Sequence, residues 1–221
     1  AMLNKYRSLF DPVLKFMDYP SVNVSSPRVD PNSCLGGHIA FIQEQGGKLR
    51  SVASPYLVYQ LALRHFGNSI YKFVKQSLPW DCTHDQSAPV PVLQDHMERG
   101  LTVHSVDLSS ATDYFPLEFQ SLVMRNLFGN IPDIDLFEDI SRSMWYCPSL
   151  KQYLQWKRGQ PLGLYPSFAV FTASHGLLLW YLNGKRWKVN GRPSFYVLGD
   201  DVVILNDILF SRYTQILQKW A

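Results

Sequence analysis

Two adjacent carboxylates at a predicted hairpin turn are the residues of this sequence best suited to chemistry. Asp200 and Asp201 follow Gly199 and lie between two apolar runs, residues 195–198 and 202–205. Two β-prone segments joined by a tight turn predict a β-hairpin with both acids at its turn. Because like charges repel each other, the turn favours a hard divalent cation such as Mg²⁺, which prefers carboxylate and phosphate oxygens. Acidic turns are also common on solvated surfaces, so this motif alone leaves both interpretations open.

A second acidic segment supplies a partner for this turn. Asp107 lies near the end of residues 101–108, which predict a strand, and Asp113 follows after a short bend. Phosphoryl transfer to a sugar hydroxyl needs mainly charge neutralisation, which two metal ions about 4 Å apart commonly provide. Two ions need carboxylates from separate backbone elements, so Asp107 and Asp200 predict a shared metal site. The alternative is that Asp107 only ends a strand and that Asp113 caps the helix expected after Pro116.

A loop with restricted backbone freedom precedes the most apolar stretch of the chain. Residues 159–167 (GQPLGLYPS) contain two glycines and two prolines, so the backbone at Gly163 is able to approach a ligand closely. Ser167 stands at the start of the helix that follows, where it either caps the helix or contacts a sugar. Both interpretations of Ser167 stay open at this point.

A basic pair follows a glycine turn in the first quarter of the chain. Lys48 and Arg50 alternate along an extended segment after Gly46 and Gly47, so both side chains face one side. Such a pair suits a triphosphate, with a forked contact from the guanidinium and a point charge from the ammonium. The alternative is an ordinary solvated face of a strand.

The composition places the chain among globular proteins. It has 221 residues, of which 46% are hydrophobic and 14% aromatic, with a net charge of +3. This mild positive charge permits a nucleic-acid partner without requiring one. The three cysteines are widely spread and show neither a disulfide framework nor ligand spacing, which favours reduced thiols in an intracellular protein. No secretory signal opens the chain, and the apolar run at 168–182 is too short and too polar to span a membrane.

The elements that position these groups follow from apolar periodicity and turn residues. Helices laid between antiparallel strands, in a repeated order, predict an α+β fold with a palm-like layout. The predicted order is a loop-rich start (1–36), short strands (37–56), two helices broken near Gly67 (55–78), a linker (85–91), a strand (101–108), a helix after Pro116 with an apolar face of Phe119, Leu122, Val123 and Leu127, a loop (131–135), a buried helix (168–182), the acidic hairpin (195–205) and an amphipathic helix (208–220).

In this order, the segments resemble motifs of the RNA-directed RNA polymerases of mitoviruses, narnaviruses, ourmia-like viruses and leviviruses. Each motif is short, but four of them in register are specific, and together they cover about residues 46–204. The similar segments are 107–116 (DLSSATDYFP) for motif A, 159–176 for motif B, 196–204 (YVLGDDVVI) for motif C, and, for the upstream fingers segment with motif F, 47–53 (GKLRSVA), Gln60 and 79–86 (PWDCTHDQ).

The resemblance implies a right-hand polymerase palm, an antiparallel sheet with packed helices, plus part of the fingers and no thumb. It divides the chain into a partial fingers region at residues 1–100 and a palm at residues 101–221. Asp107 and Asp200 would ligate two Mg²⁺ ions, for which Mn²⁺ substitutes, with Asp201 as an auxiliary ligand. These three aspartates are therefore the expected catalytic and metal-binding residues.

The resemblance also implies a nucleotide site. Lys48 and Arg50 would hold the triphosphate, Asp113 would lie by the ribose 2′-OH, and Gly163 and Ser167 would position template and sugar. The expected activity is template-directed transfer of ribonucleotides to an RNA 3′-OH, which replicates a positive-strand RNA virus genome. The expected partners are RNA template, nascent RNA and ribonucleoside triphosphates.

Three features leave alternatives to this interpretation. Many RNA polymerases carry Asn where Ser167 falls, which leaves the sugar contact of Ser167 open. The chain ends about one helix after the hairpin, so we expect a fragment without the later motifs. A reverse transcriptase shares the palm, but Gly199 before the paired acids argues against it. An inactive, genome-integrated viral remnant that at most binds RNA is the other alternative. The expected location is the host cytoplasm, with the mitochondrion as the alternative, and the oligomeric state stays open.

Overall fold

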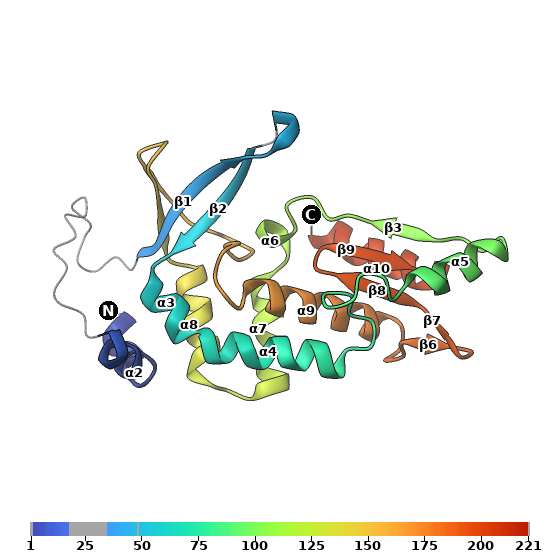
Figure 1. Ribbon diagram of the computed structural model, residues 1–221, viewed down its shortest axis with the longest axis horizontal. Coiled ribbons are helices and arrows are strands. Elements are labelled where there is room, and N and C mark those ends of the chain that lie inside the picture. Colours follow the sequence, from blue (N-terminus) through green and yellow to red (C-terminus); the bar gives the residue numbers. More distant parts are fainter. Residues whose placement is uncertain (1, 18–34, 48, 221) are drawn as a thin grey trace.

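Two sheets at opposite ends of an elongated molecule are joined by a layer of helices (Figure 1). The computed structural model describes residues 2–17, 35–47 and 49–220. The first sheet has the order β2-β1-β4-β5, from Leu49–Pro55, Leu35–Gln43, Met144–Cys147 and Gln152–Leu154. The second has the order β3-β9-β8, from His104–Val106, Asp201–Ile204 and Phe195–Leu198, and a small ribbon pairs β6 (Lys188–Val189) with β7 (Arg192–Pro193).

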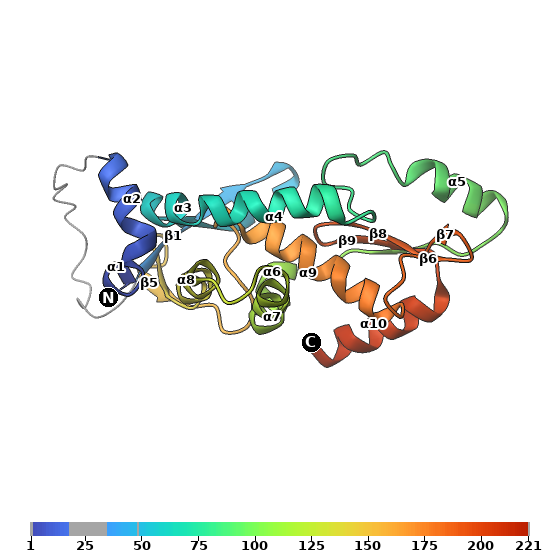
Figure 2. The ribbon, with the colours of Figure 1, turned by 90° about the horizontal axis from the view of Figure 1, so that it is seen from below.

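The central helix α9 (Ser167–Leu182) organises the core. It is apolar on nearly every side, and such a helix is stable when neighbours cover most of its surface, here from Ser167 to Leu179. Helices α4 (Arg64–Ser77), α7 (Leu117–Phe128) and α10 (Asp207–Trp220) pack against it, as does strand β8 (Figure 2). The helix therefore connects both halves of the molecule. The loop at residues 159–167 leads directly into its buried N-terminal end.

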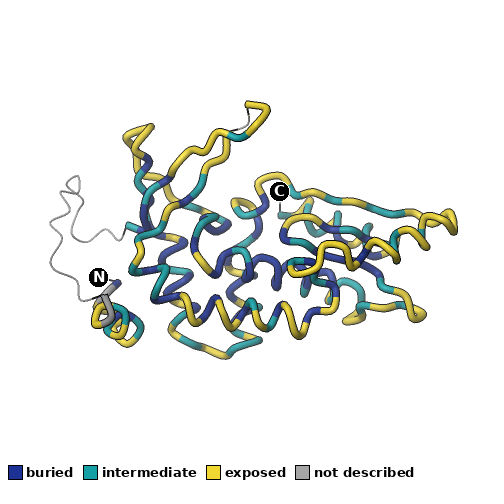
Figure 3. Tube along the Cα trace, viewed as in Figure 1, coloured by how far each residue is buried: buried dark blue, intermediate teal, exposed yellow. Residues whose placement is uncertain are grey.

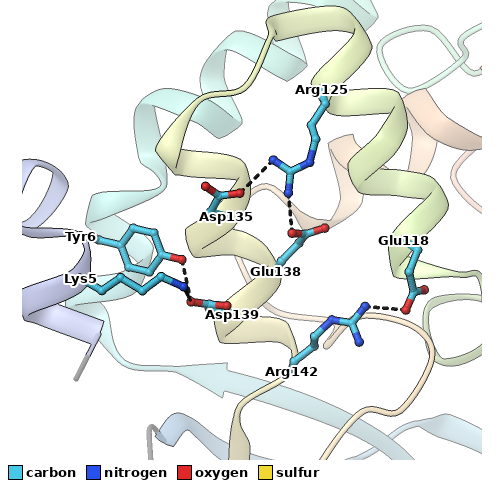
Figure 4. Close-up of polar contacts among 8 residues, drawn as sticks. All are labelled: Lys5, Tyr6, Glu118, Arg125, Asp135, Glu138, Asp139 and Arg142. Atoms are coloured by element: carbon cyan, nitrogen blue, oxygen red, sulfur yellow. Dashed lines mark hydrogen bonds and ion pairs between the residues drawn. The ribbon is translucent and has the colours of Figure 1, made fainter.

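The N-terminal helices are anchored to α8 (Pro132–Ser141). Tyr6, between α1 (Met2–Lys5) and α2 (Arg7–Met17), is buried and donates a hydrogen bond of 2.6 Å to Asp139, which also pairs with Lys5 at 2.6 Å. Further ion pairs join α7 to α8 (Figure 4): Arg125 with Asp135 and Glu138, and Arg142 with Glu118. Exposed ion pairs contribute little to stability, so apolar burial holds these helices in place.

The structure confirms most of the predicted elements. The acidic hairpin, the buried helix, the C-terminal amphipathic helix and the pair of strands around the Gly46-Gly47 turn (3₁₀ turn Gln45–Gly47) are all present. The strand before Asp107 is shorter than predicted, and α5 (Val90–Glu98) and α6 (Ala111–Tyr114) are additional short helices. The tip of the β1–β2 hairpin is exposed, whereas α9 and the strands of the acidic hairpin are largely buried (Figure 3).

The prediction of a loop-rich start is wrong for residues 2–17, which form α1 and α2. Pro12 lies inside α2, where it removes one backbone donor. Phe10 is 1% exposed, and burial of such a side chain offsets the cost of Pro12, which the Pro-, Ser- and Asn-rich composition of residues 1–36 had counted toward a loop. The rest of the predicted loop-rich start falls mainly on residues 18–34, which lie outside the described residues.

Two further expectations about helices are wrong in detail. The break in the predicted helix pair falls at Leu63, between α3 (Leu57–Ala62) and α4, and Gly67 lies within α4. A Cβ atom at Gly67 would meet the Tyr165 ring at 2.5 Å, so this glycine allows close packing and does not end a helix. Leu122, expected on the apolar face of α7, is 58% exposed, and the buried residues of α7 are Leu117, Gln120, Ser121 and Met124.

Candidate functional site

Strand pairing brings the predicted carboxylates together. Val106 pairs with Val202, so Asp107, which follows β3, lies across from Asp201 on the antiparallel neighbour β9. Leu198 pairs with Asp201, which leaves a two-residue turn of Gly199 and Asp200. Gly199 has φ +61° at the first central position of the turn, the conformation that tight hairpin turns reserve for glycine. The end of β3 and the adjoining hairpin turn therefore present three exposed carboxylates, those of Asp107, Asp200 and Asp201.

Mutual repulsion marks this group of acids. Partial burial, followed by the negative charges of Asp200 and Asp107, raises the pKa of Asp201. Among the described residues, no Lys, Arg or His forms an ion pair with any of the three carboxylates. A cation placed between them would relieve the repulsion, and their hard oxygen atoms fit a divalent ion such as Mg²⁺.

The carboxylates do not form a complete metal cage. The described part of the chain contains no group of three or more His, Cys, Asp or Glu side chains placed to hold a metal ion by themselves. Mg²⁺ is commonly bound by one or two carboxylates, while water and substrate phosphates complete its shell. The arrangement therefore fits an ion that binds together with a phosphate ligand.

His175 holds the turn from the core side through a hydrogen bond to its backbone. It lies in α9, is fully buried, and its Nδ1 atom is 2.8 Å from the carbonyl oxygen of Gly199. A carbonyl only accepts, so Nδ1 carries the proton, and the Tyr213 hydroxyl of α10 then donates to Nε2 at 2.6 Å. Burial lowers the pKa of His175 to about 4, which keeps the ring neutral at physiological pH. Helices α9 and α10 thus fix the backbone immediately before Asp200.

Gln160 ties the loop at residues 159–167 to the segment that follows Asp107. Its backbone N–H donates to the carbonyl of Thr112 at 2.8 Å. Its side chain, 0% exposed, donates to Gln120 at 2.7 Å and to the backbone carbonyl of Ser167 at 3.0 Å. The loop is therefore held to α6, α7 and α9 at once.

A second set of contacts holds the same loop to the first sheet and its following helix. Gln60 donates to the carbonyl of Gly163 at 2.7 Å and accepts from the backbone N–H of Tyr165 at 2.7 Å. Ala53 of β2 donates its backbone N–H to Leu162 at 2.9 Å. A Cβ atom at Gly163 would lie 1.8 Å from the Ala53 carbonyl oxygen, so only glycine fits this approach. The loop is therefore held to β2 and α3 as well as to α6, α7 and α9.

The predicted nucleotide residues have different degrees of access. Asp113 is exposed and accepts a hydrogen bond of 2.7 Å from the indole N–H of Trp156, which orients its carboxylate. Ser167 is 1% exposed, and its hydroxyl donates to the carbonyl of Pro161 at 3.0 Å. In this conformation Ser167 secures the loop, and a contact with a sugar stays a prediction.

Arg50 lies near the acidic turn but has an internal partner. It forms an ion pair of 2.7 Å with Glu44, and both side chains are exposed. This contact, followed by the more distant charge of Asp200, raises the pKa of Arg50. Lys48, the other half of the predicted basic pair, lies outside the described residues.

An apolar pocket of about 410 Å³ opens beside the segment that follows Asp107. Its lining is mostly apolar, so it does not suit a phosphate group, and the charged chemistry belongs to the acidic turn. The lining residues are Leu108, Ser109, Ala111, Tyr114, Phe115, Leu217 and Trp220.

Sequence reasoning missed most of the residues that hold the site in place. Gln60, Gln120, Trp156 and His175 received no structural role, although each orients a backbone or side-chain group of the site. A polar residue inside an apolar run, as at His175, is the one local signal that was available. The contacts of Gln60 and Trp156, and the contact of Gln120 with Gln160, join residues 40 or more positions apart, so no local pattern identifies them.

The comparisons with known proteins agree with the geometry. The sequence profile of the mitovirus RNA-dependent RNA polymerases matches residues 2–221. The chain belongs to this family. It is 27% identical over 183 residues to the RNA-directed RNA polymerase of Cryphonectria parasitica mitovirus 1, a match that covers 82% of this chain and 22% of that protein.

Two further relatives are uncharacterized mitochondrial proteins of Arabidopsis thaliana. They are 29% and 31% identical to this mitovirus-family chain, each over 65% of its length, and the matches cover 59% and 71% of those proteins. The chain therefore spans about a fifth of the viral polymerase and over half of each plant protein.

Solved structures share the polymerase fold at low sequence identity. The RNA-dependent RNA polymerase of a human picobirnavirus superposes with a TM-score of 0.60 at 15% identity, over 82% of this chain and 39% of that one. Apo telomerase from Candida tropicalis gives 0.59 at 13% identity, over 98% of this chain and 46% of that one. The expectation of an α+β, palm-like polymerase fold is confirmed.

Proposed function

We propose that this chain forms the catalytic palm and part of the fingers of an RNA-directed RNA polymerase. The observation that carries the proposal is the pairing of β3 with β9, which aligns Asp107 with Asp201 and sets Asp200 in the adjoining turn. Family membership supports the same activity. The division into fingers at residues 1–100 and palm at 101–221 is part of this proposal, although the first sheet contains strands from both regions.

The carboxylates of Asp107 and Asp200 would hold two divalent cations, Mg²⁺ or Mn²⁺, with Asp201 as an auxiliary ligand. When bound, these ions supply charge neutralisation for phosphoryl transfer. The primer 3′-oxygen attacks the α-phosphorus in line, the bond to pyrophosphate breaks, and the hydroxyl proton passes to solvent. The hydrogen bond from His175 to Gly199 keeps the Asp200 carboxylate at the turn during this step.

The remaining predicted residues would bind the nucleotide. Arg50 and Lys48 would contact the triphosphate, which requires Arg50 to exchange the Glu44 carboxylate for phosphate. Asp113, oriented by Trp156, would accept a hydrogen bond from the ribose 2′-OH. Gly163 and Ser167 would act through the shape of the loop that positions template and sugar.

The proposed partners are RNA template, nascent RNA and ribonucleoside triphosphates. The proposed location is the mitochondrion, because the family is named for mitoviruses and two relatives are named mitochondrial proteins. The sequence-based expectation was the host cytoplasm, with the mitochondrion as the alternative, and the comparisons support only the alternative. None of the described helices is long and apolar enough to cross a membrane.

Primer extension on an RNA template, with Mg²⁺ or Mn²⁺, tests the proposed activity. Asp200→Asn removes one negative charge at nearly constant shape, so extension should fall by at least about 100-fold, because an electrostatic contribution of this kind is commonly worth that much. Asp95→Asn, on the distant helix α5, is the matched control and should extend like wild type. Equal extension by Asp200→Asn and wild type would refute the metal assignment.

A second candidate function is RNA binding without polymerisation, as in an inactive remnant of a viral gene. Two relatives in a plant mitochondrion, both uncharacterized, favour keeping this candidate. The same assay separates the two: a folded chain that binds RNA but extends no primer with either metal is a remnant or needs further chain for activity. Extension that depends on Asp200 excludes the remnant.

A further inference from the structure

Four aromatic rings form a continuous row across the first sheet. His38 of β1 pairs with Tyr146 of β4, which pairs with Tyr153 of β5, and Tyr56 follows β2 beside His38. Ring centroids along the order Tyr56, His38, Tyr146, Tyr153 are 5.5, 6.1 and 5.1 Å apart. No ring is stacked parallel on its neighbour: the successive interplanar angles are 85°, 75° and 46°. We call these four residues the aromatic row.

The aromatic row lies on the face of the sheet that the core does not cover. Side chains alternate between the two faces of a strand. The chain neighbours of the row face the core: these are Ile39 beside His38, Trp145 beside Tyr146, and Ala53 beside Ser54, which pairs with His38. All three are at most 5% exposed. His38, Tyr146 and Tyr153 therefore point to the other face, where Tyr153 is 38% exposed, whereas Tyr56 closes the row against the core beside Tyr59. The β1–β2 and β4–β5 hairpins project from the same side of the molecule (Figure 1).

The charge on this sheet suits a polyanion. Strands β1, β2, β4 and β5 contain no Asp or Glu, and Glu44, which directly follows β1, forms an ion pair with Arg50 at 2.7 Å. Lys151 lies in the β4–β5 turn and Lys157 follows β5, and both are exposed. A strand set without acidic side chains and with flanking lysines allows a phosphate backbone to approach without repulsion.

The row is also continuous with the proposed nucleotide site. Pairing of His38 with Ser54 and of Ile42 with Arg50 places Arg50 on the same face as His38, four residues along β2 from Ser54. The negative charge of Asp200 contributes to the raised pKa of Arg50. One face of the sheet thus leads from the aromatic row to the neighbourhood of the acidic turn.

We propose that the aromatic row binds single-stranded RNA by stacking unpaired bases on its rings. Aromatic side chains on an open sheet face, flanked by basic residues, are the features with which proteins hold single strands without reading their sequence. The proposal rests on the proposed function, because the strand it would hold is the template or product of the polymerase. Tyr153, at the exposed end of the row, offers the most accessible ring.

Fluorescence anisotropy with a short labelled single-stranded RNA tests the row on the chain of 221 residues. Tyr153→Leu keeps an apolar side chain but removes the ring, and it should weaken binding about five- to tenfold, the effect of one base–aromatic stack. Tyr153→Phe keeps the ring and should bind within about twofold of wild type. Tyr181→Leu, at a tyrosine of α9 that is 65% exposed and outside the row, is the matched control and should bind like wild type.

A second measurement locates the contact directly. RNA that carries 5-iodouridine should crosslink to Tyr153 or Tyr146 on irradiation, and mass spectrometry identifies the modified residue. Equal binding by Tyr153→Leu and wild type, absence of binding by wild type, or crosslinks confined to other surfaces would each overturn the proposal. A dimer that loses its interface in Tyr153→Leu would assign the row to a second copy of the chain and overturn it as well.

Failure of the row is distinguishable from failure of the polymerase assignment. Asp200→Asn leaves all four rings intact and should bind RNA like wild type even where extension is lost. Conversely, a chain that extends a primer normally with Tyr153→Leu, at saturating and at limiting RNA, refutes the row and leaves the polymerase assignment standing.

Discussion

Removal of the imidazole beneath the acidic turn should change both the stability of the chain and its dependence on pH. In His175→Asn, the amide nitrogen takes the place of Nδ1 and continues to donate to the Gly199 carbonyl. The Tyr213 hydroxyl, however, loses the acceptor that lies 2.6 Å away in the wild type. A buried hydroxyl without a partner costs about 1–3 kcal/mol, so we expect this decrease in the free energy of unfolding at pH 7.5.

The pH dependence follows from the lowered pKa of His175. Burial lowers this pKa to about 4 from an ordinary value of 6.5. Between these values the unfolded chain binds more protons than the folded chain, so the stabilisation is complete above pH 6.5 and is lost as the pH falls toward 4. For these two pKa values, the wild type should lose about 2 kcal/mol between pH 7.5 and pH 5 through this one group. Asparagine does not titrate, so His175→Asn lacks this contribution.

Urea unfolding of both proteins across this pH range, with chelator present, measures the difference. Contributions of the carboxylates are common to both proteins and cancel in the subtraction. Tyr213→Phe is the control: it removes the hydroxyl but keeps the imidazole, so it should be destabilised at pH 7.5 and retain the wild-type slope. Parallel pH profiles for wild type and His175→Asn would refute the assignment of a buried, neutral His175.

Two further substitutions test the loop and the basic strand. Gly163→Ala should destabilise the chain by more than about 1 kcal/mol beyond Gly184→Ala, because both glycines have positive φ but only Gly163 faces a backbone oxygen within 4 Å; equal urea midpoints for the two variants would contradict this. Glu44→Gln removes the carboxylate that occupies Arg50, so a fluorescent ribonucleoside triphosphate should bind about two- to fivefold more tightly. Weaker or unchanged binding in that titration would remove Arg50 from the nucleotide site.

The acidic hairpin was predictable because its evidence is local. Apolar runs on both sides of Gly199 predict the strands, and the glycine predicts the turn. The register between β3 and β9 was not predictable from composition, because strands that lie about 95 residues apart in the sequence can pair in several alignments. The two-metal argument paired Asp107 with Asp200, and the resemblance to polymerase motifs supported that pairing, but neither gave the register.

The predictions of helices were wrong where a residue that usually breaks a helix lies inside one. Pro12 and Gly67 are both helix breakers by intrinsic preference, yet both lie inside helices. Burial of Phe10 outweighs the first preference, and contact with the Tyr165 ring requires the absence of a side chain at the second. Tertiary contacts decide these cases, and a single sequence does not display them. The same limit applies to Leu122, which periodicity placed on the buried face of α7.

The position of the acids depends on buried amides and an imidazole more than on the acids themselves. The carboxylates are exposed and repel each other, so nothing within the group fixes its geometry. Gln160 joins the loop to the segment after Asp107, and His175 joins α9 and α10 to the turn before Asp200. These contacts use partners that all lie between Thr112 and Tyr213, so the folded chain contains the groups needed to hold its acidic turn. We therefore expect the ordered turn, and the pH signature of His175, in this chain without any additional protein segment.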